Sequence, residues 1–340
     1  MTAPRQLKDL GVIHLQLIQK LLIHRSTADA GKELGLSQSS VSYHLKNLRV
    51  LFDDELFVRY QNGLKPTEHC QRLSHHINDI LSRIEDDLLQ CGSFDPANVQ
   101  KELWVVTDPT CWRWHPLLLA ELKKRTPRVT LTTQGWNSQS FKELEQGRVH
   151  FGVHILTNTP AHFHNIPLGP TERVFIMRKG HPLAQHGKVA LQDLTQYPVL
   201  IHHLSGWNCH GQSVMENVLK AHNLQLNLKA RLSDSHALFE ALKYSNAITY
   251  SSVLALPYEL SDYALLPAPP ELTQVKTHYS LYISGHRYGS QETSFMTELL
   301  YDSFQSLYEE TDRPEISRTL MQQNELLEDY LSKLTVTAAN

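Results

Sequence analysis

The chain has 340 residues, of which 41% are apolar and 20% charged, and its formal net charge is −3. This composition is typical of globular domains and excludes disorder along the whole length, collagen and low-complexity sequence. At roughly 100–200 residues per domain, the length indicates two domains and room for a smaller third piece. The small net charge excludes a uniformly basic coat for nucleic acid, although a local basic patch remains compatible with it.

Neither a membrane span nor a signal peptide is predicted. No apolar run approaches the ~20 residues that a spanning helix needs. The segment 11–23 is interrupted by polar residues such as His14 and Lys20, which fits an amphipathic helix. We therefore expect a cytoplasmic protein without a membrane partner. The cysteines Cys70, Cys91, Cys111 and Cys209 form no CxxC pair and are expected to be free thiols.

Three short helices are predicted near the start of the chain. Apolar residues recur at helical spacing over about 10–24. Ser26 can cap a second helix, which Gly35 ends, and Ser37 caps a third. Gly31 offers a small residue where another helix can approach closely. Such helices around a glycine-containing turn make a helix-turn-helix. The inward residues of the third helix are Val41, Leu45 and Leu48.

The outward face of the third helix is polar. Short hydrogen-bonding side chains lie near its N-terminus, and cations follow. A helix that enters the major groove of DNA needs base-edge donors and acceptors at its leading end and phosphate-neutralising groups behind them. A solvated helix face has the same pattern, so these residues alone leave both interpretations open. The candidate DNA contacts on this helix are Ser37, Gln38, Ser39, Ser42, Tyr43, His44 and Lys46.

A β-hairpin is predicted directly after these helices. Residues 56–60 form a short strand, and residues 64–67 return. Between them, Gln61, Asn62 and Gly63 suit a turn with positive φ. Such a wing beside a recognition helix can reach phosphates or the minor groove. Its candidate DNA contacts are Arg59, Lys65 and Thr67.

These segments resemble the winged helix-turn-helix of LysR-type transcriptional regulators, nearest the branch that includes nodulation-type regulators. The residues that match in order and spacing are Leu36, Ser37, Gln38, Val41 and Ser42, then Leu56, Phe57, Arg59, Leu64, Pro66 and Thr67. Gly31, Ser39 and Tyr43 stand where the family usually has Ala, Pro and Arg. The last departure removes a cation from the groove-facing row. The resemblance implies a regulator that binds double-stranded DNA and contacts RNA polymerase, and neither an enzyme nor a cofactor protein.

A continuous helix is predicted over about 68–90, a segment without Pro or Gly. Its residues Cys70, Ile77, Ile84 and Cys91 are seven apart, with Leu81 and Leu88 between them, which is heptad spacing. The helix can lie on its own domain or pair two subunits. The resemblance implies pairing, in a homodimer and a dimer of dimers, with recognition helices ~34 Å apart on DNA. We assign 1–67 to the DNA-binding domain and 68–92 to the dimerising linker helix.

Residues 93–308 alternate between strands and helices, which favours an α/β fold with a parallel sheet. Strands are predicted at 103–107, 129–133, 151–155, 173–177, 198–202, 226–232, 247–250, 262–266 and 279–284, and helices at 108–125, 141–146, 211–221, 235–244 and 290–307. Residues 103–155 resemble the first lobe of the effector domain of the same family, which has a periplasmic-binding-protein-like fold. The resemblance implies lobe I at about 100–168 and 267–308, lobe II at about 169–266, and a small-molecule effector between them.

Three loops at carboxyl ends of predicted strands are candidate effector contacts, because ligands of open α/β sheets bind there, near helix N-termini. The same hydroxyls can cap helices, and the tryptophans can pack in a core, so both roles remain open. The candidates are Thr107, Asp108 and Thr110, then Trp136 and Asn137, then His203, Ser205, Trp207 and Cys209.

Cys209 offers an alternative function, because it lies near the loop where peroxide-sensing members of the resembled family carry their reactive cysteine. A redox-responsive regulator would need electropositive neighbours, such as His203 and His210, and a resolving thiol, such as Cys111. A metal sensor using Cys209 and nearby histidines, including His202, is a weaker alternative. A ligand-binding or enzymatic α/β protein is a further one, although we find no GxSxG, P-loop or metal-ligand motif.

The resemblance does not cover residues 309–340. This C-terminal extension is acidic, and Leu320, Leu327, Leu331 and Leu334 lie at heptad-like spacing. We predict a helix that packs on its own subunit or makes an additional contact between subunits.

Overall fold

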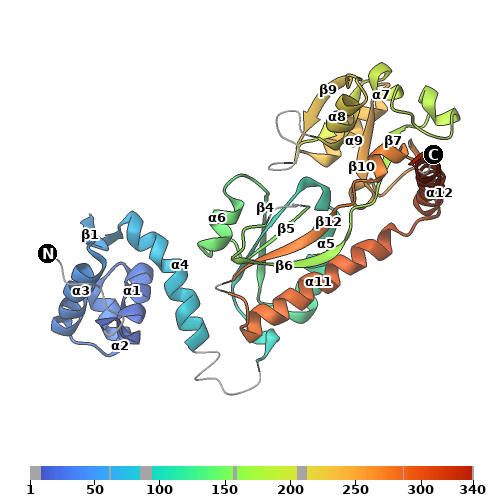
Figure 1. Cartoon of the computed structure of the whole chain (residues 1–340). Helices are drawn as coiled ribbons and strands as arrows, with labels where there is room; N and C mark the ends of the chain where they lie inside the picture. The colour runs from blue at the N-terminus through green and yellow to red at the C-terminus, as the bar shows by residue number, and fades with distance from the viewer. Residues whose placement is uncertain are drawn as a thin grey trace. The chain divides into compact units, whose positions relative to one another are not determined.

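The computed structural model describes residues 9–60, 63–84, 94–155, 159–204, 213–285 and 287–338 (Figure 1). The chain divides into two compact units. The first comprises residues 1–94 with the short segments 145–148 and 289–293, and the second comprises 95–144, 149–288 and 294–340. Across the described ranges, no helix combines the length and apolar character that crossing a bilayer requires.

The first unit contains the predicted helices and hairpin, followed by a longer helix. Its elements are α1 (Val12–His24), α2 (Thr27–Leu34), α3 (Gln38–Phe52), β1 (Phe57–Tyr60), β2 (Gly63–Pro66) and α4 (Glu68–Arg83). The predicted caps are confirmed. Ser26 Oγ accepts a hydrogen bond from the Asp29 amide at 3.3 Å, and Ser37 Oγ accepts one from the Ser40 amide at 3.2 Å. Gly35, at φ +66°, ends α2 in the left-handed conformation.

At two positions of this unit, neighbouring atoms approach the backbone so closely that only glycine fits. A Cβ on Gly31 would lie 2.9 Å from a side-chain carbon of Val41, so the predicted close contact is confirmed. A Cβ on Gly63 would lie 2.9 Å from the backbone oxygen of Arg25. Gly63 belongs to strand β2 and does not have positive φ, so that part of the turn prediction is wrong. Residues 61 and 62 lie outside the described residues.

Helix α4 lies on its own unit. Cys70, Ile77 and Leu81 are at most 3% exposed, in one core with the apolar faces of α1 and α3. These three side chains are therefore not free to form a seam with a second subunit. Ile80 is 45% exposed, and residues 85–93 lie outside the described residues. Pairing through another face of the helix stays a prediction.

Lobe I of the second unit is built on a sheet with the strand order β4-β3-β5-β12-β6 (Figure 1). The strands are β3 (Glu102–Thr107), β4 (Thr130–Gly135), β5 (Phe151–His154), β6 (Phe163–Pro170) and β12 (His278–Ser284). The accompanying helices, of which η marks the 3-10 type, are η3 (Pro96–Asn98), η4 (Pro109–Cys111), α5 (Trp114–Arg125), α6 (Ser140–Glu145) and α11 (Gln291–Thr311).

Lobe II is built on a sheet with the order β11-β7-β10-β8-β9. The strands are β7 (Arg173–Arg178), β8 (Val199–His202), β9 (Leu228–Leu232), β10 (Ile248–Ser252) and β11 (Tyr263–Leu266). The helices are η5 (Pro182–Gln185), α7 (Asp193–Gln196), α8 (Val214–Ala221), α9 (Ser235–Lys243), η6 (Val253–Ala255) and α10 (Pro270–Thr273).

The prediction of parallel sheets is only partly confirmed, because both sheets are mixed. In lobe I, β3 runs parallel to β4 and β5, whereas β12 runs antiparallel to β5 and β6. Strand β6 was not predicted, since its sequence FHNIPLGP alternates poorly and contains Pro and Gly. The predicted helix over 108–125 is divided into η4 and α5.

The chain passes twice between the lobes, as predicted. The first crossover joins β6 to β7 through Thr171 and Glu172, and the second joins β11 to β12 through residues 267–277. The Thr171 amide donates to the Thr277 carbonyl oxygen at 2.9 Å, so the two crossovers lie side by side. The two-lobed architecture is therefore present, and its connections are hydrogen-bonded to each other.

The C-terminal segment forms the helix α12 (Pro314–Ala338). It packs on α10 and β11 of lobe II. Ile316 is 2% exposed and Leu320 packs against the same core, whereas Met321 is 65% and Leu331 45% exposed. Packing on its own subunit therefore accounts for the first half of the helix, and an additional contact between subunits stays a prediction.

Candidate nucleic-acid interface and ligand cavity

The polar face predicted on α3 is exposed. The opposite side of the helix is the buried row Val41, Leu45 and Leu48, each at most 6% exposed. Tyr43 is 63% exposed, although its ring is large. The exposed candidates are Ser37, Gln38, Ser39, Ser42, Tyr43 and Lys46. The helix therefore presents hydrogen-bonding side chains and one cation to its surroundings.

Ser37, the N-cap of α3, and His44 are engaged within the unit. The Ser37 hydroxyl caps the helix and is hydrogen-bonded to the Ser39 and Ser40 hydroxyls, at 2.9 and 2.8 Å. His44 is half-buried, with Nδ1 3.1 Å from Nε2 of His14. Burial, and secondarily the His44 charge, lowers the pKa of His14. These contacts fix both side chains at the margin of the exposed row.

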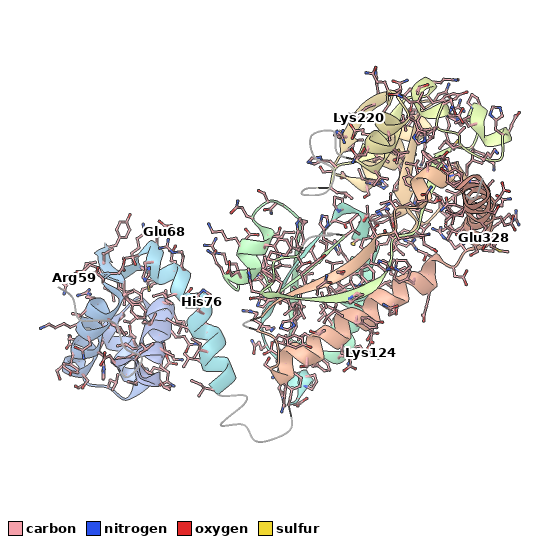
Figure 2. All side chains as sticks on the ribbon, in the orientation of Figure 1. Arg59, Glu68, His76, Lys124, Lys220 and Glu328 are labelled. Atoms are coloured by element: carbon pink, nitrogen blue, oxygen red, sulfur yellow. The ribbon has the colours of Figure 1, made fainter. Side chains whose placement is uncertain are left out.

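The hairpin carries two exposed cations, one on each of its faces, because neighbouring residues of a strand point to opposite sides. In the antiparallel pair β1–β2, Lys65 lies opposite Val58, and Arg59, which Figure 2 labels, is the next residue of β1. The Lys65 ammonium lies 5.3 Å from the centroid of the Tyr60 ring. The third candidate, Thr67, is half-buried and caps α4, and its hydroxyl donates to Asp54 at 2.7 Å.

Arg49, the last cation of the α3 face, fastens the hairpin to the helix. Its Nε donates to the Glu55 carbonyl oxygen at 3.0 Å, and Nη2 donates to the Phe57 carbonyl oxygen at 3.0 Å. The wing cations therefore stand on a hairpin that is braced against the helix. Such an arrangement can hold phosphate-binding cations at a fixed place relative to the base-edge donors of α3.

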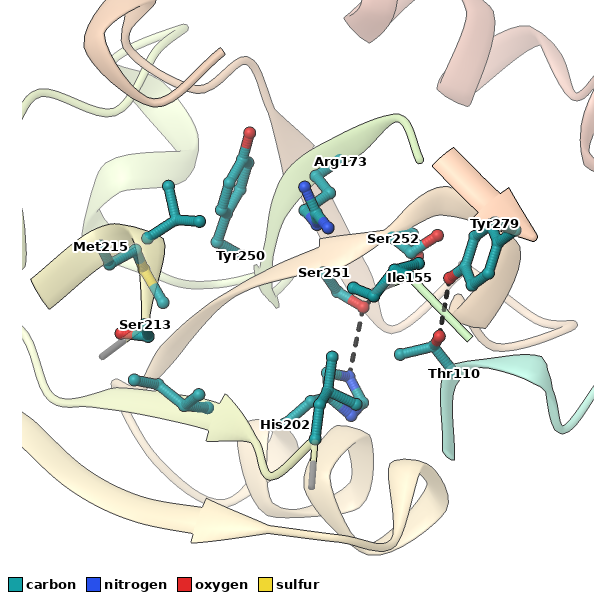
Figure 3. A pocket seen from close by; sticks show the side chains of 13 residues that line it. Thr110, Ile155, Arg173, His202, Ser213, Met215, Tyr250, Ser251, Ser252 and Tyr279 are labelled. Carbon is teal, nitrogen blue, oxygen red and sulfur yellow. Dashed lines mark hydrogen bonds between the residues drawn. The ribbon is translucent and has the colours of Figure 1, made fainter. Parts of the chain in front are cut away.

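The second unit contains a cavity of about 50 Å³ between its lobes (Figure 3). Its wall includes side chains from η4, from β12 and from the residue that follows β5 in lobe I, and side chains from β7, β8, α8 and β10 of lobe II. The lining residues are Thr110, Ile155, Arg173, Ile201, His202, Leu204, Ser213, Val214, Met215, Tyr250, Ser251, Ser252 and Tyr279.

His202 connects the lobe II wall to lobe I. Its Nε2 lies 3.2 Å from the Ser251 hydroxyl, and its Nδ1 lies 3.4 Å from the Ser235 hydroxyl. The Ser235 hydroxyl donates to the Pro109 carbonyl oxygen at 2.7 Å. Burial lowers the pKa of His202 to about 4, so the ring is neutral at pH 7. A neutral imidazole both donates and accepts, which suits two hydroxyl neighbours.

A buried carboxyl lies behind the lobe I wall. The Thr110 hydroxyl donates to Asp108 Oδ1 and is hydrogen-bonded to the Tyr279 hydroxyl at 2.6 Å. Asp108 is 1% exposed, and among the described residues its Oδ2 has no hydrogen-bond partner. Burial raises the pKa of the Asp108 carboxyl to about 6, against the opposing effect of the Thr110 hydrogen bonds.

This carboxyl predicts a pH-dependent stability. Between pH 4 and 6 the folded state holds a proton that the unfolded chain has released, so Asp108 lowers stability as pH rises through its folded pKa. Replacing Asp108 with Asn is expected to shift the free energy of unfolding, relative to wild type, by about 2 to 3 kcal/mol in the variant's favour from pH 4 to pH 7. Urea titrations at several pH values measure this difference, and a pH-independent difference would contradict it.

Arg173 supplies the positive charge of the cavity wall. Its Nη2 donates to the Thr277 hydroxyl at 3.0 Å, which holds the guanidinium near the second crossover. Hydroxyls and apolar side chains make up most of the remaining wall. This combination suits a small molecule with one anionic or strongly accepting group and an apolar body.

Of the first-loop candidates, Thr110 lines the cavity, whereas Thr107 and Asp108 are buried beside it. The Thr107 hydroxyl lies 3.1 Å from His115 Nε2. His203 is half-buried, and its amide donates to the Leu232 carbonyl oxygen at 2.8 Å. The remaining third-loop candidates, Ser205, Trp207 and Cys209, lie outside the described residues.

The second-loop candidates are not among the residues that line this cavity. Trp136 is 7% exposed and packs against Phe141, with ring centroids 5.2 Å apart. A Cβ on Gly152 would lie 2.6 Å from the Trp136 ring, so the glycine makes room for it. Asn137 Oδ1 accepts from the Gln139 amide at 2.8 Å, ahead of α6. Packing and capping account for both positions.

Several residues of the cavity wall are not among the candidates predicted from the sequence. Ser251 and Ser252 follow the predicted strand 247–250 at its carboxyl end, so the rule used for the other loops would have found them. Tyr279 and Arg173 begin strands at the crossovers, and no local pattern marks them.

The thiol proposed as a redox partner is buried. Cys111 is 0% exposed, and its sulfur lies 3.8 Å from Asp108 Oδ1. Burial, followed by the Asp108 charge, raises the pKa of the Cys111 thiol well above its ordinary value. Because the thiolate is the reactive form, this environment favours packing over thiol chemistry.

Two family models match the chain. Residues 13–71 match the bacterial regulatory helix-turn-helix of the LysR family, and residues 97–305 match the LysR substrate binding domain. Together they include the α3 face, the hairpin and the residues around the cavity. Helix α12 lies beyond both matches.

Curated relatives carry matching names. The transcriptional activator NagR of a Ralstonia species is 32% identical over 181 residues, or 53% of this chain and 60% of NagR. The transcriptional regulator SyrM 1 of Sinorhizobium fredii is 30% identical over 191 residues, or 54% of each chain. The transcriptional activator NahR of Pseudomonas putida is 29% identical over 182 residues, or 53% of this chain and 61% of NahR. The chain thus spans little more than half the length of these relatives.

Solved structures share the fold. The probable transcriptional regulator PA0477 of Pseudomonas aeruginosa has a TM-score of 0.56 at 21% identity, covering 86% of this chain and 97% of its own. A full-length OxyR variant of the same organism has a TM-score of 0.59 at 15% identity, covering 87% and 95%. With both family models matched, one of them over more than half of the sequence, the chain belongs to the LysR family.

Proposed function

We propose that the protein is a sequence-specific transcription regulator whose contacts with double-stranded DNA are switched by a small molecule bound between the lobes. The observation that carries this proposal is the exposed row Gln38, Ser42 and Tyr43 on α3. Had these side chains been buried in the unit's own core, nothing on this helix would be available to bases. The names of the matched relatives, activators and regulators of transcription, support the same class.

In this proposal α3 enters the major groove. Gln38 and Ser42 supply hydrogen bonds to base edges, whereas Lys46 and the wing cations Arg59 and Lys65 neutralise phosphates. Base contacts confer sequence preference, and phosphate contacts confer affinity and salt dependence. The Arg49 brace keeps the two sets of groups in one geometry.

We further propose a homodimer, assembled as a dimer of dimers, that acts in the cytoplasm and contacts RNA polymerase. Two-fold symmetry would set two recognition helices ~34 Å apart on a partly palindromic site. The heptad residues Cys70, Ile77 and Leu81 are used inside the unit. The face of α4 that carries the exposed Ile80 is therefore the one assigned to pairing, and sedimentation of the full chain with Ile80→Glu tests this assignment.

Ligand binding would act by changing the separation of the lobes. A cavity of about 50 Å³ has room for roughly three or four water molecules. A ligand with an apolar body larger than this must therefore move the walls apart, and it shifts the population of the two arrangements only as far as it binds them with different affinity. A thermal-shift screen of small carboxylates against the full chain tests this, since a ligand of the folded state raises the unfolding temperature.

Two substitutions separate base contacts from phosphate contacts. Lys65→Ala is expected to weaken binding to all DNA alike, by about 1 kcal/mol. It is also expected to reduce the slope of log K against log salt concentration by about one. Gln38→Ala is expected to lose about 1 to 3 kcal/mol on the cognate site and little on random DNA. Gel shifts with the DNA upstream of the gene that encodes this chain, and with random DNA, at several salt concentrations, measure the affinities of both variants. Equal losses on the two DNAs for Gln38→Ala would remove it as a base contact.

A further inference from the structure

Helix α12 inserts one side chain where two strands of lobe II separate. Strands β7 and β11 are antiparallel, with Leu266 opposite Phe175. Continuing the same register would place Ala268 opposite Arg173. The ladder stops short of that pair, and the side chain of Gln323 occupies the opening. Its Oε1 accepts from the Ala268 amide at 2.8 Å, and its Nε2 donates to the Arg173 carbonyl oxygen at 3.1 Å.

The sequence explains why the ladder ends there. Residues 267–270 read Pro-Ala-Pro-Pro, so Ala268 holds the one backbone N–H of this stretch. A carboxamide carries a donor and an acceptor in the same geometry as a peptide group, and it can bridge two strands that no longer touch. Gln323 is 7% exposed and lies one helical turn after the buried Thr319, on the core-facing side of α12. The bridge is therefore shielded from water.

The bridge joins both crossovers to the cavity wall. Arg173 is the first residue after the first crossover, and Ala268 belongs to the second. The side chain of Arg173 lines the cavity (Figure 3), and its guanidinium donates to Thr277 of the second crossover. One residue of α12 therefore holds the backbone of the residue that supplies the positive charge of the cavity.

We propose that Gln323 is a positioning residue of the ligand cavity, through which the C-terminal helix sets the place of Arg173 and the spacing of the two crossovers. Docked α12 bridges β7 and β11 where their ladder ends and holds Arg173 against the cavity wall. Release of α12 removes this bridge and leaves the crossovers joined by their bonds to each other, so whatever binds or displaces this helix changes the cavity. The role of Arg173 toward a ligand rests on the proposed function. The bridge itself rests only on the hydrogen bonds of Gln323.

The test needs no ligand and uses the full chain. In Gln323→Leu, which keeps the volume and removes both hydrogen bonds, the Ala268 amide is expected to exchange with deuterium about two- to tenfold faster. Phenylglyoxal, which modifies guanidinium groups, is expected to react with Arg173 about two- to fivefold faster, measured by peptide mass spectrometry. Arg178 on the same strand, hydrogen-bonded to Asn246, serves as the internal reference.

Two further variants make the result specific. Gln322→Leu changes an exposed neighbour on α12 and is expected to leave both rates unchanged. Gln323→Glu keeps an acceptor for Ala268 and loses the donor for Arg173, so only the Arg173 reaction is expected to accelerate. This split would not arise from loosening of the whole helix, and it stands even if Gln323→Leu fails to fold.

Wild-type rates in both Gln323 variants would overturn the proposal, as would equal acceleration in Gln322→Leu. A thermal-shift screen without any stabilising carboxylate, combined with the expected changes in the Gln323 variants, would instead count against the effector function and leave the bridge in place. The two failures are therefore distinguishable.

Discussion

Replacing Tyr43 with Glu is expected to weaken DNA binding about 10- to 100-fold at about 0.1 M salt. Tyr43 lies in the middle of the exposed row of α3 and is 63% exposed. A carboxylate there would face the phosphates and acceptor-rich base edges that the row is proposed to meet. Because the Tyr43 side chain is exposed and does not belong to the hydrophobic core of this unit, the fold should tolerate the change within about 0.5 kcal/mol.

The measurement is a fluorescence anisotropy titration with labelled duplex. Leu119→Glu, on α5 of the second unit, is the matched control, because Leu119 is 55% exposed and the change in net charge is the same. It is expected to change the affinity by less than about twofold. An equal loss in both variants would show an effect of net charge alone. Full affinity in Tyr43→Glu would place the DNA contact elsewhere.

The DNA-binding unit could be predicted because its signals are local. Ser26 and Ser37 cap helices within three residues of themselves, and Gly35 ends a helix through its own φ. Apolar spacing within one helix is enough to separate the buried row of α3 from the exposed one. The same local patterns located most strands of the second unit within a few residues.

The linker helix shows where such patterns end. The heptad spacing of Cys70, Ile77 and Leu81 indicates that one face of α4 is buried, but it does not identify the element or subunit that buries it. In the structure α1 and α3 of the same unit cover that face. The sequence likewise predicts a glycine-dependent turn at Gly63 but for the wrong reason, because the close approach of the Arg25 carbonyl oxygen, and not a positive φ, requires the glycine.

The cavity could not be predicted in detail, because its wall joins residues far apart in the chain. Thr110 and Tyr279, whose hydroxyls are 2.6 Å apart, are separated by 169 positions. Neither a strand pattern nor a cap identifies that pair. Trp136 lies at a strand end, as a ligand contact would. Because Gly152 has no side chain, however, the Trp136 ring fits into the core of lobe I.

Acid is expected to destabilise the second unit through His202. The ring is 5% exposed, and burial lowers its pKa from 6.5 to about 4. Between these values the unfolded chain binds a proton that the folded chain does not. The stabilisation is therefore complete above about pH 6.5 and is lost as pH falls toward 4, for a total of about 3 kcal/mol.

Urea unfolding followed by tryptophan fluorescence measures this loss, since all five tryptophans lie between residues 104 and 207, in the second unit. His202→Gln cannot titrate, so its stability relative to wild type is expected to improve by about 3 kcal/mol from pH 7 to pH 4. Asp108 acts with the opposite sign in both proteins and cancels in the difference. His236→Gln, an exposed histidine on α9, controls for the substitution. If wild type and His202→Gln lose stability in parallel, the ring is protonated inside the fold, and the neutral bridge between Ser251 and Ser235 is wrong.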